Sequence, residues 1–70
     1  MPKWKKAGYI WLHKSSDHGG RHIHVYDGTR EIGVYDLIEG PIRGLEIIWS
    51  PRLQKATEEI IKEIEDAGRS

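Results

Sequence analysis

Three segments between residues 8 and 37 have the pattern of apolar and polar residues that is typical of β-strands. Residues 8–14 are rich in aromatic and β-branched side chains, and residues 21–27 and 30–37 place apolar residues at every second position. Because successive side chains of a β-strand point to opposite faces, the period of two predicts the second and third strands, and the aromatic and β-branched content predicts the first. A fourth strand is predicted at 44–49, after a break at Glu39-Gly40-Pro41, and it is the least regular of the four.

After Ser50 the apolar residues follow the period of a helix. Ser50 can cap the N-terminus of a helix, Pro51 suits its first position, and Gly68 suits the residue after its last turn. The apolar stripe of this segment consists of Leu53, Ala56, Ile60, Ile61, Ile64 and Ala67. The sequence therefore predicts one domain, residues 1–70, of the α+β class. It is a two-layer structure in which an antiparallel sheet of three to four strands carries the C-terminal helix on one face.

Asp27-Gly28 lies between two strand segments and is a favoured hairpin turn. A two-residue loop at these positions sets His24 opposite Glu31 and His22 opposite Gly33. One face of the sheet is then apolar, and we expect the helix to cover it; this face carries Ile10, Leu12, Ile23, Val25, Ile32 and Val34.

The opposite face is predicted to be an open platform of aromatic and histidine side chains. Gly33 would leave room for a ligand to approach His22. The residues of this platform are Tyr9, Trp11, His13, His22, His24, Tyr26, Glu31 and Tyr35. Two histidines on the wet face of a strand, with His18 just upstream, are unusual in composition and make this face the candidate functional site.

The composition excludes several kinds of site and indicates where the protein is expected to be found. The chain has 70 residues and no cysteine, so disulfides and thiolate metal sites are excluded and a reducing cytoplasm is the expected compartment. No apolar run is long enough to cross a bilayer, which predicts a soluble protein without a membrane partner or a secretion signal. The net charge of zero divides into +4 for residues 1–30 and −4 for residues 31–70. The first half can therefore present a basic surface to an anion.

RNA is the first ligand that such a platform suits. Aromatic rings stack on unpaired bases, at about 1–3 kcal/mol per base, and basic side chains hold phosphates. The predicted binding residues are Tyr9, Trp11, His13, Arg21, Tyr26 and Tyr35, with Lys3, Lys5, Lys6 and Lys14 as further phosphate contacts. His22 and His24 could also act as general base and acid on a ribose 2′-hydroxyl, with Glu31 orienting His24. Such catalysis contributes about 10²–10⁴-fold, and the sequence leaves open whether the chain is an enzyme that cleaves RNA slowly without a cofactor.

Two alternatives remain at the level of sequence. Residues two apart on a strand lie about 7 Å apart, so His22 and His24 can reach one ion, with His18 or Asp17 joining from the loop; Zn²⁺ or another divalent transition metal would suit these imidazoles. The exposed aromatic residues can instead form a protein interface, either with a partner or in a homodimer, with Trp11 as the anchor.

The segment Asp17-His18-Gly19-Gly20-Arg21-His22-Ile23-His24-Val25 resembles the D-H-x-P-P-H-x-H-V hallmark of small prokaryotic proteins catalogued as domain of unknown function 4160. Five residues match at identical spacing, and Gly20-Arg21 stand where the family has two prolines: the matches are Asp17, His18, His22, His24 and Val25. The opening Met1-Pro2, the Gly-Tyr pair and the closing helix are also similar. The resemblance implies a small αβ domain of a toxin-antitoxin-like pair, which favours RNA or a cognate small protein as the partner over a metabolic role.

Overall fold

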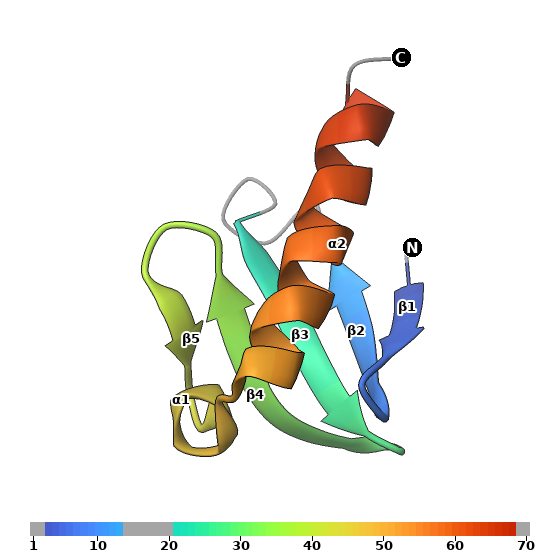
Figure 1. Ribbon diagram of the computed structural model, residues 1–70. Coiled ribbons are helices and arrows are strands. Elements are labelled where there is room, and N and C mark those ends of the chain that lie inside the picture. Colours follow the sequence, from blue (N-terminus) through green and yellow to red (C-terminus); the bar gives the residue numbers. More distant parts are fainter. Residues whose placement is uncertain (1–2, 14–20, 69–70) are drawn as a thin grey trace.

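A five-stranded antiparallel sheet and two helices make up the computed structural model, which describes residues 3–13 and 21–68. The strands follow one another in chain order across the sheet: β1 (Lys3–Lys6), β2 (Tyr9–His13), β3 (His22–Asp27), β4 (Arg30–Asp36) and β5 (Gly40–Ile42). The short helix α1 (Leu45–Ile48) follows β5, and the long helix α2 (Pro51–Gly68) lies across one face of the sheet (Figure 1). The predicted α+β class is confirmed, but the sheet has five strands instead of three to four. Within the described ranges, neither helix is long and apolar enough to span a membrane.

The two edge strands, β1 and β5, are the strands that the alternating pattern did not predict. In β1, exposed Lys3 and Lys5 alternate with half-buried Trp4, and the high charge of this segment hides its period of two. In β5, Pro41 lacks the N–H that a central strand needs, but an edge strand tolerates this loss. Lysines on one edge, and proline in a three-residue strand on the other, both discourage pairing with a further strand.

Residues 44–49 do not form the predicted fourth strand; most of this segment is the helix α1. The backbone leaves the sheet through two successive residues in the left-handed region, Arg43 at φ 55° and Gly44 at φ 107°. Gly44 is needed there because a Cβ would lie 2.8 Å from the carbonyl oxygen of Ile32. Only Leu45 of α1 is fully buried, while Ile47 is 81% exposed. The segment therefore buries one side chain against the core instead of alternating across a sheet.

The hairpin between β3 and β4 differs from the predicted one by its turn and by a bulge. Asp27 pairs with Arg30, so the turn residues are Gly28 and Thr29, with Gly28 at φ 65°. The register then shifts between Val25 and Tyr26, as an extra residue in β4 is accommodated. Beyond this bulge, each residue of β3 pairs with a residue of β4 three positions later than predicted. Gly33 pairs with Val25, Val34 with His24, Tyr35 with Ile23 and Asp36 with His22.

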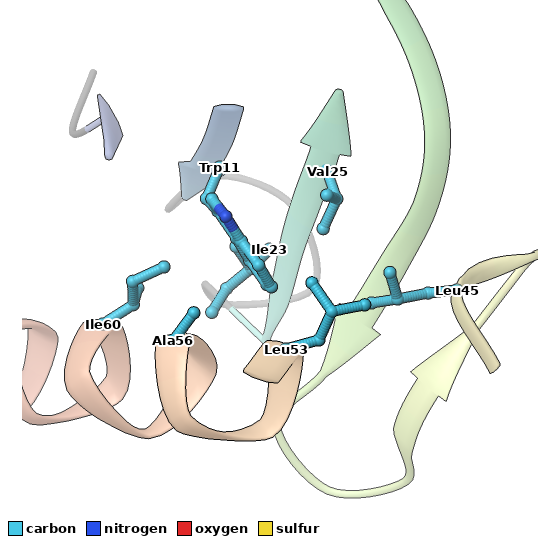
Figure 2. Close-up of a cluster of buried hydrophobic side chains, with 7 residues drawn as sticks. All are labelled: Trp11, Ile23, Val25, Leu45, Leu53, Ala56 and Ile60. Carbon is cyan, nitrogen blue, oxygen red and sulfur yellow. The ribbon is translucent and has the colours of Figure 1, made fainter. Parts of the chain in front are cut away.

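The hydrophobic core lies between α2 and the sheet, and α1 closes it at one end (Figure 2). Trp11 lies at its centre with 0% of its surface exposed, and its Nε1 donates a hydrogen bond to the Lys6 carbonyl oxygen at 3.1 Å. The other buried members of the cluster are Ile23, Val25, Leu45, Leu53, Ala56 and Ile60. The prediction that the helix stripe packs on Ile23 and Val25 is confirmed.

The sequence placed the side chains of β2 and of Val34 on the wrong sides of the sheet. Trp11 pairs with Val25 and His13 with Ile23, so Tyr9, Trp11 and His13 belong to the helix side of the sheet. Both faces of β2 are apolar, one aromatic and one aliphatic, so alternation alone cannot decide which face the helix covers. Pairing with β3 decides it, and Ile10, Leu12 and Val34 lie on the other side.

Candidate functional site

The side of the sheet away from α2 carries both histidines of β3, and we call it the histidine face. Strand pairing gives its other described side chains, which come from all five strands: Lys3, Lys5, Ile10, Leu12, Tyr26, Glu31, Val34, Asp36 and Ile42. His22 is 5% exposed and His24 is 8% exposed. The exposed side chains among these residues are those of Lys3, Lys5 and Glu31.

Asp36 is the centre of the first polar cluster on the histidine face. Its Oδ2 lies 3.0 Å from His22 Nε2, and its Oδ1 accepts hydrogen bonds from Arg21 Nε at 2.8 Å and from the backbone N–H groups of Ile38 and Glu39 at 2.8 and 3.0 Å. The hydrogen bond from Arg21 holds the pKa of Asp36 well below its usual range, against the opposing effect of burial. Asp36 is therefore an ionised carboxylate with only 2% of its surface exposed.

The second polar cluster consists of His24 and Glu31. His24 Nδ1 contacts Glu31 Oε1, as the sequence predicted. Glu31 pairs with Tyr26 in the register, so it reaches His24 diagonally across the bulge. The rings of His22 and His24 lie close together, with their centroids 6.3 Å apart and their planes at 78°.

Each imidazole is thus oriented by a carboxylate, but through a different nitrogen. An ionised carboxylate only accepts hydrogen bonds. His22 therefore donates to Asp36 through Nε2, and His24 donates to Glu31 through Nδ1. A carboxylate that fixes the tautomer in this way is the arrangement by which proteins prepare histidine for proton transfer or for ligand binding.

Most of the predicted aromatic platform lies elsewhere. Trp11 is buried in the core, so it can neither stack on a base nor anchor a partner. Tyr9 and His13 belong to the helix side, and so does Tyr35, whose ring stacks on Trp49 with centroids 5.5 Å apart. Of the predicted platform, the histidine face keeps His22, His24, Tyr26 and Glu31, and Arg21 joins them through Asp36.

The space expected beside Gly33 is also filled. Gly33 pairs with Val25 and lies under α1, where a Cβ would come within 2.5 Å of the Leu45 nitrogen. Gly33 therefore permits helix packing and does not open a path to His22.

Asp36 is the site residue that reasoning from sequence missed. The predicted strand 30–37 contained Asp36, but a register without the shifted turn and the bulge placed Gly33 opposite His22. One local signal was available: an aspartate at the end of a strand commonly accepts hydrogen bonds from backbone N–H groups two or three residues later. Asp36 does so with Ile38 and Glu39.

The predicted metal ligands are brought together only in part. His22 and His24 are adjacent on the histidine face, whereas His18 and Asp17 lie outside the described residues. In the ranges 3–13 and 21–68, no group of three or more His, Asp or Glu side chains is arranged to hold a metal ion.

Comparison of the chain with protein-family models, with curated proteins and with solved structures found no match.

The depressed pKa of Asp36 predicts how stability depends on pH. A carboxyl group with a lowered pKa in the folded state stabilises the protein in full above its unfolded pKa, which is 3.8 for an ordinary Asp. This stabilisation is lost as the pH falls further toward the folded value. Asp36→Asn should therefore be less stable than wild type at pH 7, and the difference should narrow as the pH falls below about 4.

Urea unfolding followed by circular dichroism at several pH values measures this difference. Asp27→Asn, at an exposed position of the β3–β4 hairpin, is the matched control and should keep the wild-type dependence. A constant gap between wild type and Asp36→Asn from pH 7 to pH 2 would show that Asp36 is not held as an ionised group.

Proposed function

We propose that this protein engages RNA through the histidine face, as a small domain of a toxin-antitoxin-like system. The observation that carries the proposal is the pair of histidines on one sheet face, each in contact with its own carboxylate, beside exposed cations. Imidazoles that are oriented in this way are suited to hydrogen bonds with phosphate and ribose.

The cations around the two histidines would supply most of the affinity. Lys3 and Lys5 are exposed on the edge strand β1, and Arg21 is 37% exposed where it contacts Asp36. Through Leu12, Lys3 lies two strands from His24, which is about 10 Å at the usual spacing of strands. A single RNA strand that crosses the sheet from β1 to β3 would therefore meet lysines first and imidazoles next.

Base stacking has a smaller part in this proposal than the sequence suggested. Tyr26 is the half-buried aromatic residue of the histidine face, whereas Trp11 and Tyr35 belong to the helix side. Recognition then depends mainly on phosphate contacts and on one stacked base, which favours single-stranded RNA with little sequence preference.

RNA cleavage is an extension of the same proposal. One imidazole would accept the proton of a ribose 2′-hydroxyl as its oxygen attacks the adjacent phosphorus, and the other would donate a proton to the departing 5′-oxygen. The products would be a 2′,3′-cyclic phosphate and a free 5′-hydroxyl. Glu31 would act as a positioning residue for His24, and Arg21 would stabilise charge on the phosphate.

The proposal is tested by the salt dependence of binding to a short oligouridylate. For single strands, each phosphate contact contributes about −0.7 to the slope of log K against log salt concentration. The double variant Lys3→Gln, Lys5→Gln should bind more weakly, with a slope that is smaller in magnitude by about 1.4. The matched control is Arg30→Gln, Lys62→Gln, which removes the same charge from exposed positions outside the histidine face and should leave the slope unchanged.

Equal slopes for the two double variants would contradict RNA binding at the histidine face. A complex that persists or tightens in high salt would instead identify a protein partner or self-association through apolar contacts. If the bound RNA is cut, His24→Gln should abolish cutting, and His13→Gln, on the helix side of the sheet, should not.

A further inference from the structure

A cleft opens on the helix side of the sheet, between the β1–β2 turn and the first turns of α2. Its volume is about 240 Å³, and it lies on the opposite side of the sheet from the histidine face. Among the described residues that line it, three are cations and one is an acid: Lys6, Ala7, Arg52, Lys55, Ala56 and Glu59. Nothing in the proposed function uses this cleft.

The charges of the cleft are unbalanced. Lys6 Nζ forms an ion pair with Glu59 Oε1 at 3.0 Å, so the carboxylate of Glu59 is already paired with a cation. Arg52 and Lys55 make no ion pair or side-chain hydrogen bond with any residue in the described part of the chain. Two cations in the wall of one cleft therefore remain available to an anion.

The position of these cations in α2 opposes the stability of the helix. The N-terminus of a helix is its positive end, where acidic residues stabilise and basic residues destabilise. The first turn of α2 has no acidic residue, and Arg52 is its second residue. Lys55 precedes Glu59 by four positions, and a lysine before a glutamate at this spacing stabilises a helix less than the reverse order does. Residues that break a local stability rule are expected where a function requires them.

We propose that this cleft binds a phosphate group. The planar guanidinium of Arg52 can donate two parallel hydrogen bonds to a phosphate, and the ammonium groups of Lys55 and Lys6 add point charges from either side. Bound phosphate would also neutralise the unfavourable charge at the N-terminus of α2. The phosphate can belong to a nucleic acid or to a small phosphorylated molecule, since the recognising chemistry is the same.

The test is a titration of the ¹⁵N-labelled protein, first with inorganic phosphate and separately with a short oligouridylate. In wild type, the amide signals of Ala7 and Ala56 should shift and saturate, because both residues line the cleft. Arg52→Gln, Lys55→Gln should weaken this binding about tenfold or more, the effect expected when two charge-assisted contacts are lost. The control Arg30→Gln, Lys62→Gln should bind as wild type does.

The two probes identify the source of the phosphate. Saturation by inorganic phosphate alone indicates a small phosphorylated ligand, and saturation by RNA indicates a nucleic acid. The melting temperature without ligand provides a second readout: the Arg52→Gln, Lys55→Gln variant should melt at or above the wild-type temperature, because the cations oppose the helix dipole. Absence of shifts at Ala7 and Ala56 with both probes, or unchanged binding by this variant, would overturn the proposal without affecting RNA binding at the histidine face.

Discussion

Replacing Trp11 with alanine is expected to reduce the free energy of unfolding by about 3–5 kcal/mol. The indole is fully buried at the centre of the core, and its Nε1 donates to the Lys6 carbonyl oxygen, which would lose this partner. A domain of 70 residues has a total stability of roughly 4–10 kcal/mol, so the variant should be close to unfolding. Urea denaturation followed by circular dichroism gives the difference.

Ile47→Ala is the control for the Trp11 variant. Ile47 is 81% exposed on α1, so its truncation should change stability by no more than about 0.5 kcal/mol. Had Trp11 belonged to an open platform, as the sequence pattern predicted, its replacement would also cost little. A loss below about 1 kcal/mol for Trp11→Ala would therefore contradict the observed register of β2 on β3.

Gly33→Ala is expected to have the second largest effect. The new Cβ would lie 2.5, 2.6 and 2.8 Å from the nitrogen, Cβ and Cα of Leu45. None of these atoms can move by a change of rotamer, so α1 must shift away from β4 and Leu45 must leave its position in the core. We expect a loss of about 1–3 kcal/mol or more, together with changes in the amide signals of residues 45–48.

A second variant separates this clash from a simple change of side-chain volume. Leu45→Ala keeps the three clashing atoms, so it should not rescue Gly33→Ala. If Gly33 opened to solvent, alanine would restrict the unfolded chain and raise stability by about 0.4–1 kcal/mol. An increase in stability on Gly33→Ala would thus contradict the packing of α1 on β4.

The elements with a strong period were predictable from sequence, and those at the edges were not. The strand β3 and the helix α2 follow their apolar periods, and the helix stripe packs as predicted on Ile23 and Val25. The segment Lys3–Lys6 is too charged, and Gly40–Ile42 too short, for alternation to be recognised. Both form strands because a neighbouring strand supplies the pairing, which is a tertiary effect.

His22 and His24 share one face of the sheet, as predicted, but the residues around them depend on details of the register. The contact of His24 with Glu31 was predicted. The platform was wrong because both faces of β2 are apolar and because the bulge near Tyr26 displaces β4. The same displacement brings Asp36 to His22, where sequence had placed Gly33. The shifted turn and the extra residue in β4 together therefore give His22 a carboxylate partner that the sequence did not predict.

The most direct test of RNA binding at the histidine face is a ¹H–¹⁵N titration of the wild-type protein with a short single-stranded RNA. Binding there predicts saturable shifts of the His22, His24 and Tyr26 signals, accompanied by those of Lys3 and Lys5 on the same face. These shifts should weaken as salt is raised, because phosphate contacts are lost. If the histidine-face signals stay unchanged while RNA is saturating, or if only residues on the α2 side respond, the histidine face is not an RNA-binding surface.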